Sequence, residues 1–449
     1  MKAVLIHASV PILYIGAYGN EAVRTPELDW LAAEGIVFDA HETDGGGPEQ
    51  FLRTLITGRH AFAARAEDSS VLLAHLKQAN AAPVLFTTSQ SPPSGDWTLS
   101  DSLPGEIGMT PIAEAVSSLL DRLADYSDWF FVLDLGRVER EKIEVAVSEE
   151  PPPEDEDDNS PASESDDDTE LLEEAADLDV DDSDLERVEE DQTETDDEAE
   201  DLEPAEDPAG SLDDDEINDP EVQSLLEGQA ETTADAEDFD VFFGWLRAEL
   251  EERGLWDDSV LIFTGQGDSA RPDGLCSEGP DHPLRPSLSR LPLIVRLPAQ
   301  AHSGRRVAAL TQPADLTASL LSWLGQPPAA IHGNSLAHLC ESRTQTSRAY
   351  TCAATRRGAD QALALTTAAW KYLLLSSSEG EARRWLFRQP EDRFGRMDLY
   401  QQKLDFAERL EACLLDYVAA AKLNGPVIAP ELPSDEPTKN PEAVERKEA

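Results

Sequence analysis

A glycine-rich turn in front of a predicted helix is the stretch of this sequence best suited to hold a ligand. The turn is Gly45-Gly46-Gly47-Pro48, and the segment after it has Leu52, Leu55 and Ile56 at helical spacing. Backbone N–H groups at a helix start have no partner within the helix, so Gly46 and Gly47 can present theirs to an anion. The same residues also make a common turn, and this structural interpretation stays open beside the anion-binding one.

Other residues that could do chemistry occur singly rather than in motifs. His7 follows an apolar stretch, and a lone histidine at a strand end is usually structural. Asp268, Asp281 and His282 stand in loop-like sequence, which favours turn roles over metal or anion contacts. None of the four cysteines has C-x-x-C spacing, so we interpret them as ordinary thiols: Cys276, Cys340, Cys352 and Cys413.

The segments that would position the turn alternate between strand and helix patterns. Ala3–His7 is the predicted first core strand, Thr25-Pro26 opens a helix that Gly35 ends, and Ile36–Phe38 is a strand. Beyond the turn we expect a helix and a strand within 69–89, a loop over 96–108, a helix over 110–126 and a buried strand over 129–135. This order predicts an α/β fold with a mostly parallel central sheet and helices on both faces.

The second half of the sequence continues this pattern and then changes to a small α+β pattern. We expect an amphipathic helix at 239–253, strands at 260–264 and 290–298, and a helix from Asp315 to Gly325. The last part predicts strands at 349–353, 362–366 and 370–375, closed by a helix at 404–418. The tail beyond Asn424 is rich in Pro, Glu and Lys and is expected to be disordered.

An acidic insertion interrupts the fold. Residues 148–238 hold about 43 of the chain's 92 acidic residues and one arginine, Arg187. Such a segment cannot bury enough apolar surface to offset its ordering entropy, so we predict disorder, with transient helix at 170–176 and 221–226. It acts either as a solvated insertion that keeps the protein in solution or as an arm for a basic protein partner.

The overall charge excludes several functions. A formal net charge of −57 argues against non-specific binding of nucleic acid or of anionic membranes. No apolar run is long enough for a membrane helix. The N-terminal apolar stretch leads directly into the first motif and leaves no room for a cleavage site, so we expect a cytoplasmic protein.

Several motifs along the chain occur in a familiar order. They are Tyr18-Gly19, Thr25-Pro26-x-Leu28-Asp29-x-Leu31-Ala32-x-Glu34-Gly35-x-x-Phe38, Leu55-Ile56-Thr57-Gly58-Arg59, Arg290-Leu291-Pro292-Leu293-Ile294-Val295 and Ala369-Trp370-Lys371-Tyr372. This succession resembles the sulfatase family, within the alkaline-phosphatase-like superfamily. The resemblance covers nearly the whole chain except the insertion and the tail, and it implies the fold of that superfamily.

The resemblance also implies where a sulfatase would hold its chemistry, and those positions have changed. Members carry a cysteine nucleophile and an arginine before Thr57-Gly58; the matching positions are Pro48 and Leu52. The metal-binding aspartate pair after the first strand falls on Ala8 and Ser9. The Asp-His-Gly metal motif after strand 260–264 places its Asp on Gln266 and its His on Gly267, with Asp268 two positions late.

We therefore expect a degenerate member with no catalytic residue, no metal and no cofactor. Its expected parts are a sulfatase-like domain at 1–147 and 239–345, the acidic insertion at 148–238, a small α+β subdomain at 346–424 and a tail at 425–449. The expected function is a catalytically inactive, binding or regulatory protein. The alternative is an active sulfuric or phosphoric ester hydrolase that uses Ser9, Thr54 or His60, with Asp268 and Asp281 near a Ca²⁺ or Mg²⁺ ion.

Overall fold

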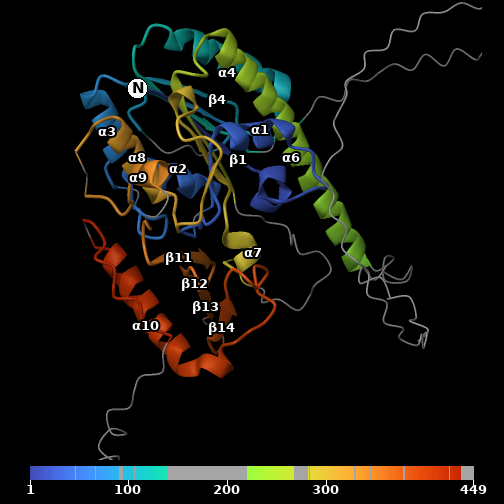
Figure 1. Cartoon of the computed structure of the whole chain (residues 1–449), viewed down its shortest axis with the longest axis vertical. Helices are drawn as coiled ribbons and strands as arrows, with labels where there is room; N and C mark the ends of the chain where they lie inside the picture. The colour runs from blue at the N-terminus through green and yellow to red at the C-terminus, as the bar shows by residue number, and fades with distance from the viewer. Residues whose placement is uncertain are drawn as a thin grey trace, which may run out of the picture. The chain divides into compact units, whose positions relative to one another are not determined.

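A sheet of eight strands forms the centre of the computed structural model (Figure 1). From one edge to the other the strands are β10 (Arg305–Val307), β2 (Ile36–Phe38), β9 (Leu293–Arg296), β8 (Ser259–Gly265), β1 (Lys2–Ala8), β6 (Trp129–Asp134), β3 (Ala82–Thr87) and β4 (Leu99–Ser102). All neighbours are parallel except that β9 runs antiparallel to both β2 and β8. The predicted mostly parallel sheet is confirmed.

The structure describes residues 1–45, 47–65, 67–90, 95–105, 107–136, 138–139, 220–266, 282, 284–327, 330–342, 346–377, 380–423 and 425–435. All of them belong to one compact unit. The disorder predicted for 148–219 and for the tail beyond 435 concerns residues outside this described set. The disorder predicted for 425–435 is wrong, because the Tyr350 hydroxyl donates to the carbonyl of Pro430 at 2.8 Å and Val427 and Leu432 pack against the C-terminal core. The helices of this described part lack an apolar stretch of the length that a membrane span requires.

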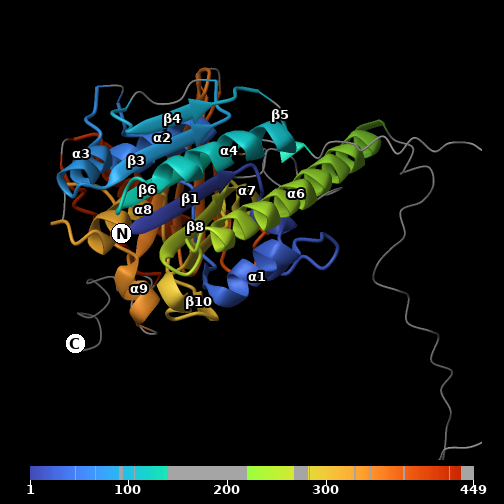
Figure 2. The same ribbon diagram turned by 90° about the horizontal axis from the view of Figure 1, so that it is seen from above.

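Helices cover both faces of the sheet, because successive residues of a strand point to opposite faces. Val4 and Ile6 of β1 pack in one core with α1 (Pro26–Glu34), α4 (Met109–Leu123) and α6 (Pro220–Glu252), which Figure 2 shows on one side of the sheet. Ala3 and Leu5 pack in the opposite core with α2 (Pro48–Thr57), α3 (Val71–Gln78), α8 (Ala314–Trp323) and α9 (Ala337–Glu341).

The C-terminal part is a four-stranded antiparallel sheet with one long helix. Its order is β11 (Tyr350–Arg357), β12 (Asp360–Thr367), β13 (Trp370–Ser376) and β14 (Arg383–Arg388). The helix α10 (Leu404–Ala421) lies along it (Figure 1). Phe406, Leu410 and Leu414 of α10 pack into the core that also holds Leu365 and Tyr372. Shorter elements are β5 (Ile107–Gly108), β7 (Val138–Glu139), α7 (Pro286–Ser289) and the 3-10 turns η1 (Ile12–Tyr14) and η2 (Gly16–Tyr18).

Two further local predictions are wrong. The loop expected at 96–108 contains the edge strand β4, which forms by pairing with β3 alone. Three of its four residues are exposed, so its sequence shows no alternation of apolar and polar residues. The helix expected to begin at Phe239 begins at Pro220. Its first turns are acidic, yet acidic residues suit the positive end of a helix dipole, and Ala236 is fully buried in the core. The disorder predicted for 220–238 is therefore replaced by helix.

Candidate functional site

Three neighbouring parallel strands end in polar residues that face one another. His7 of β1 pairs in register with Asp134 of β6, which pairs in turn with Thr87 of β3. His7 Nδ1 lies 2.7 Å from Asp134 Oδ1, and the Thr87 hydroxyl donates to Asp134 Oδ2 at 2.7 Å. All three side chains are buried, and the His7 ring stacks on Phe51 of α2 with ring centroids 3.9 Å apart. These groups satisfy one another, which fits the structural role expected for His7.

The positions of the expected aspartate pair follow directly on β1. Ala8 is fully buried, and its carbonyl accepts the N–H of Gln266 at 3.1 Å. Ser9 is partly buried. Gln266, the position matching the metal-binding Asp, follows the end of β8. The two segments thus lie side by side at the carboxyl edge of the sheet, where open α/β folds usually bind ligands.

The glycine-rich turn is shaped by its contact with the C-terminal sheet. Gly45 has a φ of +95°, and a Cβ there would lie 2.3 Å from the carbonyl oxygen of Ala354 in β11. Gly47 is the N-cap residue of α2, and its carbonyl accepts from the N–H groups of Gln50 and Phe51. Pro48 begins α2, and Leu52, at the position of the family's arginine, is fully buried. Close packing accounts for Gly45, whereas Gly46 lies outside the described residues.

The remaining predicted contacts are distributed around the edge. Gly267, Asp268 and Asp281 lie outside the described residues. His282 is buried, its Nδ1 accepts the N–H of Leu284 at 3.0 Å, and its Nε2 lies 3.3 Å from the carbonyl oxygen of Leu374. The His282 ring thus joins the segment before α7 to the C-terminal sheet.

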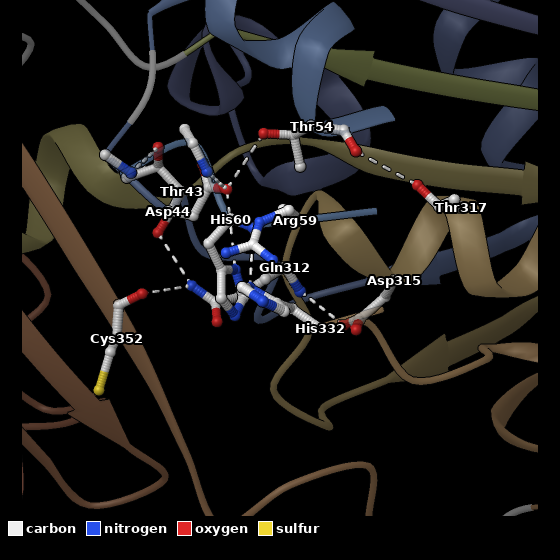
Figure 3. A network of polar contacts seen from close by, with 12 residues as sticks. Thr43, Asp44, Thr54, Arg59, His60, Gln312, Asp315, Thr317, His332 and Cys352 are labelled. Atoms are coloured by element: carbon white, nitrogen blue, oxygen red, sulfur yellow. Dashed lines mark hydrogen bonds and ion pairs between the residues drawn. The ribbon is translucent and has the colours of Figure 1, made fainter. Parts of the chain in front are cut away.

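A second polar cluster lies behind the turn (Figure 3). Asp44 Oδ2 accepts the N–H of Ala61 at 2.7 Å and the hydroxyl of Thr54 at 3.4 Å, and lies 3.7 Å from His60 Nδ1. The other ring nitrogen of His60 lies 2.9 Å from the Tyr417 hydroxyl. An acid, a histidine and a hydroxyl in series resemble a catalytic relay, but Asp44, Thr54 and His60 are all buried. In this conformation the series has no access for a substrate.

The same cluster extends into α8. Asp315 is fully buried and accepts the N–H groups of Gln312 at 2.8 Å and Asn334 at 2.7 Å, and it also pairs with Arg348. The Gln312 amide donates to the carbonyl of Cys352 in β11 at 2.9 Å. The Gln312–Cys352 bond and the Asp315–Arg348 pair tie α8 to the C-terminal sheet and the segment before it, whereas the other two bonds fix the start of α8 and the loop before α9. The cluster therefore has a structural role.

A buried ion pair adds to this junction. Lys371 Nζ of β13 lies 2.8 Å from Glu42 Oε2 and donates to the hydroxyls of Ser289 at 2.5 Å and Thr366 at 3.0 Å. Arg290 Nε lies 3.5 Å from the other oxygen of Glu42. Burial alone would raise the pKa of Glu42, but Lys371 and Arg290 outweigh it and hold this pKa below its usual value.

Metal ligands are not gathered in the part of the chain that the structure describes: no group of three or more His, Cys, Asp or Glu side chains there could hold a metal ion. The buried carboxylates Asp134, Asp44 and Asp315 each serve separate hydrogen-bond networks. The sequence suggested no site role for any of these three, and Asp315 was expected only to open a helix. Asp134 carried a signal, as the polar residue that ends a continuous apolar strand, whereas Asp44 and Asp315 had none.

The comparisons with known proteins bear on the fold. No protein-family model and no curated protein matches the chain. Among solved structures, a phosphonate monoester hydrolase of Agrobacterium radiobacter is similar with a TM-score of 0.60 at 14% identity, over 94% of this chain and 96% of that one. A protein solved in complex with its substrate D-glucosamine-2-N,6-O-disulfate is similar with a TM-score of 0.59 at 13% identity, over 93% of this chain and 96% of that one.

A sulfatase candidate from Bacteroides fragilis gives a TM-score of 0.58 at 12% identity, over 94% of this chain and 96% of that one. At such identities the likeness shows the fold alone. The chain has the α/β fold of sulfatases and phosphonate monoester hydrolases over nearly its full length, as the resemblance in the sequence implied.

Proposed function

We propose that this chain is a sulfatase-like protein that has lost hydrolytic activity and acts by binding. The observation that carries the proposal is the chemistry of the family's site positions. Sulfate-ester hydrolysis needs a nucleophile, a cation to orient it and carboxylates that hold a divalent metal. Ala8, Pro48 and Leu52 have no side-chain oxygen or nitrogen with which to do any of this.

Burial supports the same proposal. Ala8 and Leu52 are fully buried in a closely packed core. The space around them cannot accept the larger polar side chains that catalysis would need at these positions. The substitutes that an active hydrolase would need are engaged elsewhere, since Thr54 donates to Asp44 and His60 contacts Tyr417. Ser9, Asp268 and Asp281 are the residues on which an active ester hydrolase would depend.

The decisive experiment measures metal content and ester hydrolysis together on the full chain. Aryl sulfate and aryl phosphate are offered with Ca²⁺, Mg²⁺ or Mn²⁺, and we expect neither stoichiometric metal nor turnover. Asp268→Ala and Ser9→Ala are the matched variants. Bound metal with turnover that either variant abolishes would overturn the proposal and would establish a site rebuilt from different residues.

The binding role is assigned to the acidic insertion, with a basic protein as partner in a cytoplasmic location. Removing 148–238 would cut away the first turns of α6, which starts at Pro220, so the deletion must end before that residue. Deletion of 143–213 leaves that helix whole. We expect binding of a lysine-rich peptide that weakens with salt and is lost in the deletion.

The control for this test keeps the length of the insertion and changes only its charge. Replacing Asp and Glu in 143–213 by Asn and Gln should abolish peptide binding as fully as the deletion does. Binding that survives neutralisation would contradict an electrostatic arm.

A further inference from the structure

A small pocket lined by three arginines lies apart from the family's site positions and shares only Arg290 with the buried ion pair described above. Its volume is about 140 Å³, and its walls come from the η1–η2 segment, α7, β10 and the loop after β14. Arg290, Arg306 and Arg393 line it together with one carboxylate, Asp39. Three cations against one anion leave an excess of two positive charges, in a chain whose formal net charge is −57.

The three arginines differ in how far their charge is already compensated. Arg306 is paired with Asp39, with Nε 3.1 Å from Oδ1. Arg290 Nε lies 3.5 Å from Glu42, but that carboxylate is also bound by Lys371 at 2.8 Å. One buried carboxylate thus serves two cations. Arg290 Nη2 also donates to the neutral side-chain oxygen of Gln389 at 3.1 Å, which leaves the charge of Arg290 incompletely compensated and able to attract another anion.

Arg393 has no carboxylate within ion-pair distance in the described part of the chain. Its guanidinium stacks over the ring of Phe394, with 4.6 Å from the guanidinium carbon to the ring centroid. Stacking uses the face of the guanidinium and leaves its in-plane N–H groups available to an acceptor. The geometry therefore presents an unpaired, oriented donor at the rim of the pocket.

An independent observation points to an acceptor inside. Ser287 lines the pocket and is 6% exposed, yet its hydroxyl has no hydrogen-bond partner among the described residues. A buried hydroxyl that makes no hydrogen bond destabilises the fold, so such groups usually meet a ligand or water. Ile12 and Leu13 supply an apolar wall beside it.

We propose that this pocket binds the sulfate or phosphate group of a small organic anion. Arg393 and Arg290 bind the oxyanion with charge-assisted hydrogen bonds, the Ser287 hydroxyl donates to it, and the organic part lies against Ile12 and Leu13. The acidic charge elsewhere in the chain does not prevent this, because charges farther away than about 8 Å are largely screened at physiological salt. The proposal is independent of whether the chain hydrolyses esters.

Titration calorimetry of the full chain with phenylphosphonate tests the proposal. Its phosphorus is bonded directly to carbon, so it has no ester bond to hydrolyse and reports binding alone. Inorganic phosphate and inorganic sulfate are measured beside it at constant ionic strength. We expect saturable 1:1 binding of all three, and phenylphosphonate to bind more tightly than inorganic phosphate because of the apolar wall.

The variants separate this pocket from general attraction between charges. Arg393→Gln should weaken phenylphosphonate binding about tenfold or more, and Ser287→Ala several-fold. Arg409→Gln is the matched control, because Arg409 also stacks on a phenylalanine, Phe406, but does not line the pocket. No saturable binding, or equal affinity of the Arg393→Gln and Arg409→Gln proteins, would overturn the proposal.

Discussion

The Asp240 carboxylate caps the first helix of the chain at Leu28, although the two residues are 212 positions apart. Asp240 Oδ1 accepts the N–H of Leu28 at 2.8 Å, and Oδ2 accepts that of Glu27 at 3.2 Å. Thr25, at the N-cap position, makes no capping bond of its own, since its hydroxyl instead accepts the N–H of Gly16. The helix that follows the acidic insertion is thereby bonded to α1.

This cap gives stability a defined dependence on pH. Burial raises the pKa of Asp240 to about 6, although the N–H groups of Leu28 and Glu27 act to lower it. Because the folded-state pKa lies above the usual value of about 4, its contribution is fully present below pH 4 and is lost as pH rises to 6. Between these pH values the contribution of Asp240 to the free energy of unfolding falls by up to about 1.4 kcal/mol per pH unit.

The test compares wild type with Asp240→Asn, which keeps an acceptor but cannot ionise. The free energy of unfolding of wild type, minus that of the variant, should fall between pH 4 and pH 6 and stay constant above pH 7. Urea denaturation followed by tryptophan fluorescence measures it. A difference that does not change over this range would show that Asp240 ionises in the fold as readily as in the unfolded chain.

The buried pair of Lys371 and Glu42 predicts that losing one partner destabilises the protein more than losing both. The Lys371→Met protein leaves the Glu42 carboxylate buried with only Arg290 nearby, and breaking such a pair costs about 3–5 kcal/mol. The double variant Lys371→Met with Glu42→Gln should be more stable than the single one, because no buried charge is left unpaired: Arg290, which loses its carboxylate, is 26% exposed to water. Urea denaturation curves of the three proteins decide this, and a single variant that loses less than about 1 kcal/mol would speak against it.

The elements that the sequence predicted well are those with a strong local period. Helix α4 and strand β6 were expected close to their observed bounds, because five buried apolar residues recur on one face of α4 and β6 is continuously apolar. Strand β4 lacked such a signal, since Leu99 is its one buried residue. Helix α6 was cut short in the prediction because its acidic first turns resemble the insertion before it.

The candidate sites were less predictable, because they depend on distances across the fold. His7, Asp134 and Thr87 meet through strand register, which no local pattern reveals. The pocket around Arg393 and Ser287 joins segments from both ends of the chain. Resemblance to a family located the carboxyl edge of the sheet, and it is silent about an anion pocket built from other residues.

His41 predicts a loss of stability on acidification. It is fully buried, and burial lowers its pKa to about 3 although Asp44 and Glu42 act in the opposite direction. The unfolded chain takes up a proton near pH 6.5 and the folded chain does not, so stability falls as pH drops from about 6.5 toward 3. In urea denaturation between pH 7 and pH 5, the free energy of unfolding of the His41→Gln protein should fall less steeply than that of wild type, by up to about 1.4 kcal/mol per pH unit. Equal slopes for both proteins would contradict a neutral His41.

Gly45 predicts that the turn before α2 tolerates no side chain. Its φ of +95° disfavours any other residue, and an added Cβ would lie 2.3 Å from the backbone oxygen of Ala354, which cannot move without disturbing β11. Gly358 is the matched control, because its φ of +61° is also positive but a Cβ there would meet nothing within 4 Å. Overpacking costs about 1–3 kcal/mol, so Gly45→Ala should destabilise the protein by that much more than Gly358→Ala in thermal or urea unfolding. Equal losses in the two variants would mean that the turn and β11 can separate, and that close packing is not why glycine stands at position 45.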